Sequence, residues 1–164
     1  MDFVADELAG GRRFRILKVV DQFSRLSPLL EVDFSLTGAK VATALTRAAA
    51  TYGLPRSITV DKGSEFFSKA MDTWAYRNGV RLDFIRSGRP VEDAYIESFN
   101  GRLRDECLNA EIFFSIEDAR KKLERWRIDY NADRAHSSLG NLAPVEFERR
   151  SQKNPITEPE ILNL

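Results

Sequence analysis

The sequence is poor in the residues that build covalent cross-links and zinc sites. Its 164 residues include one cysteine, Cys107, and one histidine, His136. A single cysteine excludes a disulfide within the chain, and one residue of each kind cannot supply the four ligands of a Cys/His zinc site. Any metal ion would therefore be held by oxygen ligands, which favours magnesium or manganese.

Long apolar runs and net charge are lacking as well. No stretch approaches 18 apolar residues and no signal-peptide pattern is present, so we expect a cytoplasmic protein. The 25 basic residues balance the 25 acidic ones, so bulk charge argues neither for nor against a polyanionic partner. The charge is locally uneven, because residues 120–127 hold five basic side chains and one acid. Such a cluster is often no more than a solvated helix face.

What is present suits one soluble domain. A hydrophobic content of 43% with 30% charged residues is ordinary for a globular protein of this size. We expect the folded domain to span residues 1–150. Residues 151–164 contain two prolines and many polar side chains, which predicts a loose tail.

Alternating and β-branched stretches predict five strands: 1–5, 14–20, 28–34, 57–61 and 80–85. The first three are close together in the sequence, which predicts an antiparallel meander. Each of the last two is separated from its predecessor by a helical pattern, which predicts parallel pairing through a crossover.

Helices are predicted from period-3.6 patterns with caps and stops: 38–52 after Thr37, 67–78 before Gly79, 94–109, 115–130 from the Ser115 cap, and a short one from Pro144. The order of elements predicts an α/β fold, with a mixed five-stranded sheet of three antiparallel strands then two parallel ones. Helices would cover both faces of this sheet.

The predicted helix 94–109 has two distinct stripes. At 100° per residue, one stripe is apolar and consists of Ile96, Phe99, Leu103 and Cys107. Glu97 and Arg104 fall on the adjacent stripe. The helix can therefore bury one side and hold an acid and a guanidinium rigidly beside it. Cys107 is expected to be a buried small hydrophobe, and Trp74, Tyr76, Trp126 and Tyr130 are expected to pack in the core.

Three acids have positions that invite a functional interpretation. Asp2 lies in the first strand, Asp61 at the end of the fourth, and Glu97 in the first turn of its helix. Ligands often bind near strand ends of sheets that contain parallel strands. Each acid alone could equally be a surface carboxylate, and Glu97 could simply complement its helix dipole.

The residues that flank these acids carry more information than the acids alone. The segments are Val60–Phe66 (Val-Asp-Lys-Gly-Ser-Glu-Phe), Tyr95–Gly101 (Tyr-Ile-Glu-Ser-Phe-Asn-Gly), Tyr130–Gly140 and Pro144–Phe147. Together they resemble the catalytic core of DDE transposases and retroviral-type integrases, most closely the second reading-frame product of the IS3 family of insertion sequences. The resemblance covers roughly residues 1–148 and implies an RNase H-like fold.

The resemblance implies a polynucleotidyl transferase that cleaves and transfers DNA strands with Mg²⁺ or Mn²⁺, expected as two ions. Asp2, Asp61 and Glu97 would be the catalytic metal ligands. The implied partners are the DNA of transposon ends and target, and a second copy of the chain in a homodimer or higher oligomer. By the same resemblance, Arg104 would contact a DNA phosphate, and Asn100 and Lys62 would also face DNA.

The chain also departs from the family pattern. Lys62 and Ser64 replace the usual Asn and Pro, and Glu92 and Asp93 add negative charge in a loop expected to approach DNA. The family normally has a DNA-binding region and more of the first strand before the acid at Asp2. We therefore expect an N-terminally truncated core.

Two other functions remain open on the sequence. One is a catalytically weak or inactive remnant that binds DNA or dimerises. The other is an RNase H-like nuclease for RNA–DNA hybrids, which the closing segment 131–139 disfavours. His136 would either stabilise that closing segment or contact DNA.

Overall fold

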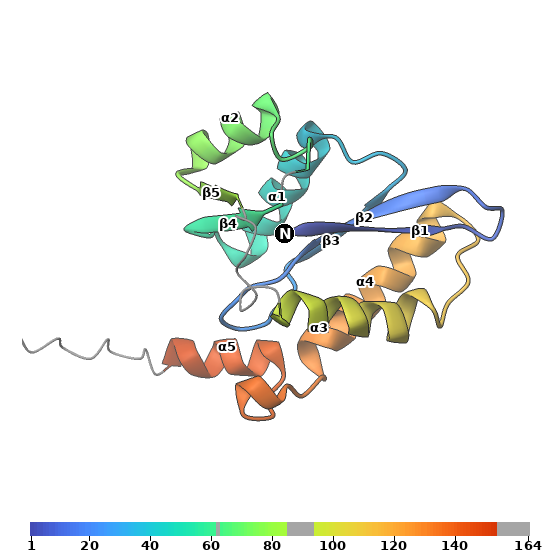
Figure 1. Ribbon diagram of the computed structural model, residues 1–164. Coiled ribbons are helices and arrows are strands. Elements are labelled where there is room, and N and C mark those ends of the chain that lie inside the picture. The colour runs from blue at the N-terminus through green and yellow to red at the C-terminus, as the bar shows by residue number, and fades with distance from the viewer. Residues whose placement is uncertain (62, 85–93, 154–164) are drawn as a thin grey trace, which may run out of the picture.

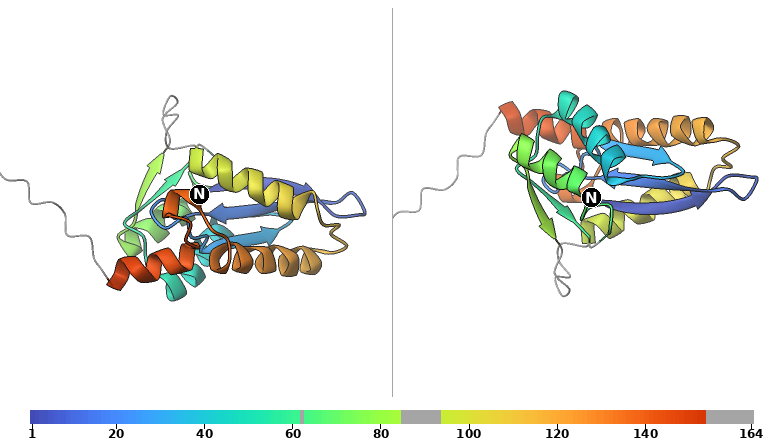
Figure 2. Two further views of the ribbon diagram at one scale, coloured as in Figure 1. Left: turned by 90° about the horizontal axis from the view of Figure 1, so that it is seen from below. Right: turned by 90° about the horizontal axis from the view of Figure 1, so that it is seen from above.

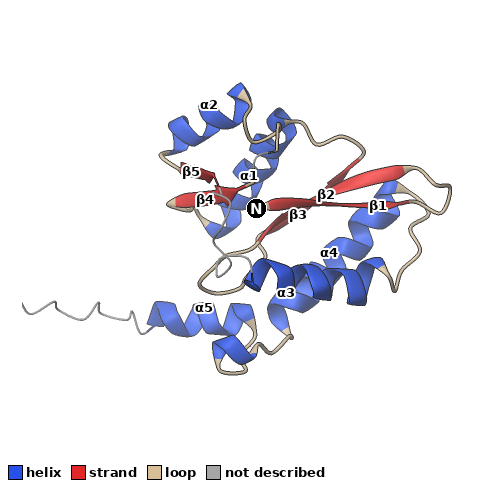
Figure 3. Cartoon of the chain, viewed as in Figure 1, coloured by secondary structure: helices blue, strands red, loops and turns tan. Residues whose placement is uncertain are grey.

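Within residues 1–61, 63–84 and 94–153, which the computed structural model describes, five strands form two sheets (Figures 1 and 3). Strand β1 (Asp2–Glu7) pairs antiparallel with β2 (Arg13–Val19), and β2 pairs antiparallel with β3 (Leu29–Asp33). Strands β4 (Ser57–Val60) and β5 (Arg81–Phe84) pair in parallel. The predicted α/β class and strand directions are confirmed.

The two sheets meet where β1 begins. The backbone nitrogen of Met1 donates a hydrogen bond of 2.8 Å to the carbonyl oxygen of Thr59 in β4. A continuous ladder needs successive bonds of this kind along both strands. This single bond does not make a ladder, so the strands form two sheets side by side. The sequence predicts one five-stranded sheet instead.

The helices that precede the two parallel strands start and stop at the expected signals. Helix α1 (Gly38–Tyr52) is capped by the Thr37 hydroxyl, which accepts a bond from the Lys40 nitrogen. Helix α2 (Lys69–Asn78) ends at Gly79, whose left-handed backbone suits glycine. It begins two residues later than predicted, because Ser68 is its cap and leaves the residues before it non-helical.

The second half of the chain is mainly helical. Helix α3 (Ala94–Leu103) continues into the π-helical turn η1 (Arg104–Leu108), so the predicted helix 94–109 has two parts. Helix α4 (Ile116–Ala132) follows its predicted Ser115 cap. The short 3-10 turn η2 (Ser137–Leu139) leads to α5 (Pro144–Lys153). Residues 151–153 are thus helical, and the rest of the predicted tail lies outside the described residues.

Helices cover both faces of the three-stranded sheet, as predicted (Figure 1). Leu17 of β2 packs with the layer that contains α1 and α2, whereas Phe14 and Ile16 pack with the layer that contains α3 and α4. Side chains alternate between the faces of a strand, so β2 contributes to both layers. Seen from below, α3 and α4 lie along one side of this sheet (Figure 2).

Three of the four aromatic residues assigned to the core are buried there: Trp74, Trp126 and Tyr130. The prediction for Tyr76 is wrong, since this side chain is 90% exposed. It follows Trp74 by two positions on α2, which turns it about 200° away from the buried face. None of the helices in the described part of the chain is both long and apolar enough to span a membrane.

A buried amide joins α4 to the segment that leads into β3. Asn131 is 4% exposed, and its Oδ1 accepts a hydrogen bond of 2.8 Å from the Ser27 nitrogen. Its Nδ2 donates one of 2.9 Å to the Ser27 carbonyl oxygen, which Arg127 also contacts. Ser27 is fully buried, so its backbone groups have no access to water. The amide therefore satisfies polar groups that the core would otherwise leave unpaired.

We predict that Asn131→Ala lowers the free energy of unfolding by about 1–3 kcal/mol, because it leaves the buried Ser27 N–H unpaired. Urea denaturation followed by circular dichroism measures the change. Asn78→Ala is the matched control, since the exposed Asn78 makes a local bond to the Trp74 carbonyl. Equal effects of the two substitutions would contradict the assigned role of Asn131.

Candidate metal and DNA-binding site

Asp2 is held by a buried lysine on the neighbouring strand. The two residues are direct partners in the β1–β2 register. Asp2 Oδ2 accepts a hydrogen bond of 2.6 Å from Lys18 Nζ, and Asp2 Oδ1 accepts one of 2.6 Å from the Phe3 nitrogen. The Lys18 side chain is only 3% exposed, compared with 33% for Asp2. The first candidate ligand is thus already engaged in an ion pair.

Asp61 follows β4 at the point where the two sheets meet. Its Oδ1 accepts a hydrogen bond of 2.8 Å from the Gly63 nitrogen, and a Cβ at residue 63 would lie 2.9 Å from the same oxygen. Burial lowers the pKa of the Met1 amino group to about 6; Lys18 lowers it too, and both Asp2 and Asp61 raise it. Both carboxylates therefore lie close enough to the Met1 nitrogen to act on it electrostatically.

Glu97 lies on the helix that begins near the sheet junction. It lies exposed in the first turn of α3, and α3 begins on the side of the molecule where β1 starts (Figures 1 and 2). Phe99, Leu103 and Cys107 bury the adjacent apolar stripe of this segment, as predicted, while Ile96 is half-buried. Burial raises the pKa of the Cys107 thiol to about 11, which fits a structural cysteine.

The three carboxylates are suitable ligands for magnesium or manganese, since these ions prefer oxygen donors. Within residues 1–61, 63–84 and 94–153, however, no three carboxylate, histidine or cysteine side chains converge closely enough to hold a metal ion. The structure brings Asp2 and Asp61 to one junction and Glu97 to the adjoining helix. The assignment of all three as metal ligands stays a prediction.

The predicted DNA-binding residues differ in how they are presented. Arg104 is exposed at the first position of η1. Asn100 is half-buried, and its Oδ1 is inaccessible and lacks a hydrogen-bond partner among the described residues. Its Nδ2 is the side-chain atom that could donate to a phosphate. Lys62 and the acidic pair Glu92 and Asp93 lie outside the described residues.

His136 is a structural centre of the closing segment. It is 7% exposed, and its ring packs edge-on against Tyr130 with centroids 5.0 Å apart. Its backbone nitrogen donates to Leu142, and its carbonyl oxygen accepts from Leu139 and Asn141. These bonds support its predicted role in stabilising the segment. Burial, together with the positive charges of Arg102, Arg134 and Arg25, lowers the pKa of its imidazole to about 4.

Two features of this region were not predicted from the sequence. One is Lys18, whose signal is a lone charge in the middle of the apolar stretch Phe14–Val20. The other is the gathering of Arg25, Arg102 and Arg134 near Tyr130 and His136, which comes from three separate segments. Periodicity within a segment carries no information about such a gathering.

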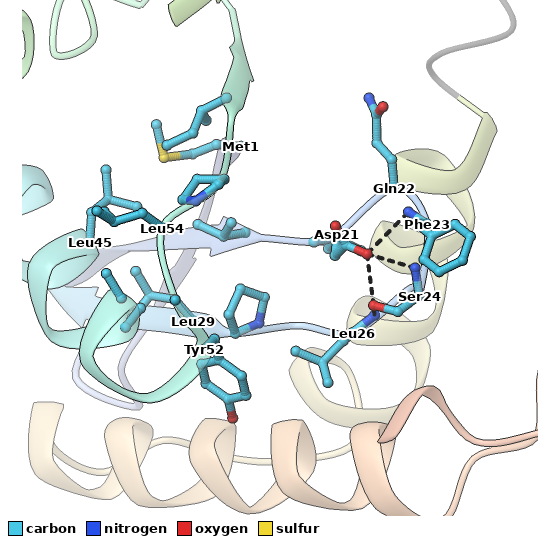
Figure 4. Close-up of a pocket in the computed structure, with 18 of the residues that line it drawn as sticks. Met1, Asp21, Gln22, Phe23, Ser24, Leu26, Leu29, Leu45, Tyr52 and Leu54 are labelled. Atoms are coloured by element: carbon cyan, nitrogen blue, oxygen red, sulfur yellow. Dashed lines mark hydrogen bonds between the residues drawn. The ribbon is translucent and has the colours of Figure 1, made fainter. Parts of the chain in front are cut away.

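A cavity of about 460 Å³ lies between the β2–β3 connection and the end of α1, and Met1 and Thr59 of the sheet junction are among the residues that line it (Figure 4). Asp21 points its Oδ2 at the nitrogens of Phe23 and Ser24 and at the Ser24 hydroxyl. This acid is therefore used to shape its own turn. None of the three candidate ligands is among the described residues that line the cavity, although the cavity reaches the sheet junction at Met1 and Thr59.

Residues 1–90 and residues 78–144 each match a family described as an integrase core domain. The chain is 50% identical over 147 residues to an uncharacterized 31.7 kDa protein of insertion element IS407 from Burkholderia multivorans, covering 90% of this chain and 53% of that protein. It is 29% identical over 136 residues to the transposase InsF for insertion sequence IS3A of Escherichia coli, covering 81% and 47%. The chain thus spans about half the length of these curated relatives.

Solved structures with the same fold are viral integrases. The catalytic core domain of BIV integrase superposes with a TM-score of 0.69 at 16% identity, covering 95% of this chain and 97% of that one. A chain of the simian T-cell lymphotropic virus intasome gives 0.78 at 16% identity, covering 99% and 59%. The HTLV-2 integrase core in complex with magnesium gives 0.67 at 14% identity, covering 89% and 94%. The predicted RNase H-like architecture is confirmed.

We predict that His136 makes stability depend on pH. The unfolded chain protonates this imidazole near pH 6.5, whereas the folded protein keeps it neutral to about pH 4. Its contribution is thus fully present above pH 6.5 and is lost as the pH falls toward 4. Melting curves should show the Tm advantage of the wild type over His136→Asn shrinking across this range. A difference that stays constant with pH would contradict the burial of a neutral imidazole.

Proposed function

The chain belongs to the integrase core domain family, and on this premise we propose that it is a DDE transposase core that cleaves and transfers DNA strands. The observation that supports the proposal is that Asp2 and Asp61 both act electrostatically on the Met1 amino group at the junction of the two sheets, near which the helix of Glu97 begins. These are the three acids that the sequence motifs single out.

Each acid has a defined anchor in the fold. Asp2 and Asp61 lie at the ends of strands from different sheets, and the Met1–Thr59 hydrogen bond fixes those ends relative to each other. Glu97 lies on a helix whose adjacent apolar stripe is fixed by the buried Phe99 and Leu103. Rigid elements of this kind hold ligands more accurately than loops do. Bound Mg²⁺ or Mn²⁺ ions would activate the attacking oxygen and stabilise the leaving oxygen of a phosphodiester.

The net charge of the protein is zero, so it would bind DNA through local clusters of basic residues. Arg104 is exposed about two turns beyond Glu97 on the continuation of α3. Arg25, Arg102 and Arg134 form a second basic group near the buried Tyr130 and His136. Contacts to phosphates fix the register of DNA without reading its sequence. These arginines would thus position the strand beside the carboxylates.

We also propose a homodimer or higher oligomer as the working form. The structures of the HTLV-2 integrase core carry the descriptions "dimeric form" and "trimeric form", so that protein associates through its core domain. The chain exposes large apolar side chains, including Phe114 at 73% and Ile112 at 63% exposure. Apolar groups of this size in solvent are suited to burial between subunits.

A second candidate function is a DNA-binding module without catalytic activity. The observation that favours it is the engagement of Asp2 by Lys18, together with the absence of a three-ligand cluster among the described residues. Such a module would retain the fold and the basic clusters. The two functions differ in whether the carboxylates are needed for an activity on DNA.

We predict that the chain joins its own element's end DNA to a target in Mg²⁺ or Mn²⁺. Asp2→Asn, Asp61→Asn or Glu97→Gln should each reduce joining by about 100-fold or more, because each removes a metal ligand. Strand-transfer products resolved on denaturing gels measure the activity.

The control for this experiment is Glu117→Gln, since Glu117 is exposed in the first turn of α4 as Glu97 is in α3. This variant should keep wild-type joining. If none of the five proteins, the wild type included, joins DNA while all bind it equally, the non-catalytic module is the correct function.

We predict that Arg104→Ala weakens duplex DNA binding to a similar extent for all sequences. The slope of log affinity against log salt should fall in magnitude by about 1, as expected for one lost phosphate contact. Fluorescence anisotropy over a salt series measures both effects. Arg77→Ala on the remote helix α2 should leave the slope unchanged. An unchanged slope in Arg104→Ala would remove this residue from the DNA interface.

A further inference from the structure

Lys18 is a charged residue in an interior position. It is 2% exposed overall, and β2 places it on the same face as Ile16, toward the layer of α3 and α4. Asp2 is its direct register partner, so both side chains project from that face of the hairpin. The lysine therefore lies on the side of the sheet from which Glu97's helix approaches.

A buried ammonium group requires a compensating charge. Removing it from water without a partner is strongly unfavourable, whereas pairing it with a carboxylate offsets much of that cost. Among the described residues, Asp2 supplies this partner, with Nζ and Oδ2 2.6 Å apart. In the described part of the chain, Asp2 is the only carboxylate that contacts Lys18, so the lysine depends on this pair.

The same pairing changes what Asp2 can offer to a metal ion. Its Oδ1 already accepts a backbone bond from Phe3, and its Oδ2 contacts a full positive charge. A divalent cation on either oxygen would be repelled by the ammonium group at short range, in a region shielded from water. The approach of the metal and the contact of Lys18 with Asp2 are therefore competing events.

We infer that Lys18 is a positioning residue that competes with the divalent ion for Asp2. Its ammonium group neutralises the carboxylate when no metal is bound, and it must leave Oδ2 before Asp2 can ligate. The inference rests on the proposed function, because it concerns the same three carboxylates. On this inference, Lys18 sets the concentration of divalent ion at which the site is occupied.

The test is Mn²⁺ binding by the full chain, measured by isothermal titration calorimetry and by the loss of the free Mn²⁺ EPR signal. Lys18→Met keeps the length and packing of the side chain and removes its charge. We expect it to bind Mn²⁺ about 10- to 100-fold more tightly, the range typical of changes around metal ligands. Lys40→Met is the matched control, since Lys40 forms a comparable 2.7 Å pair with Asp33 away from the site.

A double-mutant cycle separates this role from a general effect on the fold. In an Asp2→Asn background, Lys18→Met should no longer change Mn²⁺ affinity, because its effect acts through that carboxylate. Should Lys18→Met fail to fold by circular dichroism, Lys18→Gln replaces it, as the amide keeps a donor and lacks the charge.

Unchanged or weaker Mn²⁺ binding by the Lys18 variant would overturn the inference. The proposed function is judged separately by Asp61→Asn, which leaves the Lys18–Asp2 pair intact. If Asp61→Asn weakens Mn²⁺ binding while the Lys18 variant equals the wild type, the metal site stands and the competition does not. If Asp61→Asn has no effect on binding, the proposed metal site itself is wrong.

Discussion

Strand β2 is buried on both faces, and the rest of the structure is arranged around that constraint. Leu17 faces the layer of α1 and α2, whereas Ile16 faces the layer of α3 and α4. Because strand side chains alternate, Lys18 must share the face of Ile16. The hairpin register then sets Asp2 opposite it. The side chain at this position cannot reach water, so its charge must be paired inside the protein. The ion pair with Asp2 therefore follows from the fold.

This constraint links the stability of the fold to the chemistry of the candidate site. The junction at Met1 and Thr59 brings Asp61 toward Asp2, and the packed face of α3 holds Glu97 nearby. A site of three carboxylates with no cation would place like charges close together, which is unfavourable. Lys18 relieves part of that repulsion. A transposase core would exchange this internal cation for a metal ion, and a non-catalytic DNA-binding module would keep it.

Much of the fold could be predicted from local sequence signals. The caps at Thr37 and Ser115 and the stop at Gly79 identified helix ends because capping chemistry acts within a few residues. Long-range contacts could not be predicted in this way. The Asn131–Ser27 pair joins residues 104 positions apart, and the division into two sheets depends on how far β1 and β4 run together. The partner of Lys18 follows from the hairpin register, but its burial requires the helices of both layers.

The central claim is that Asp2 exchanges Lys18 for a divalent ion. Crystals of the protein grown with and without Mn²⁺ test it most directly through anomalous diffraction. The account predicts a Mn²⁺ peak within coordination distance of Asp2 and Asp61, with Lys18 Nζ moved away from Asp2 Oδ2. An ion-free site in saturating Mn²⁺, with Lys18 still bonded to Asp2, would contradict it.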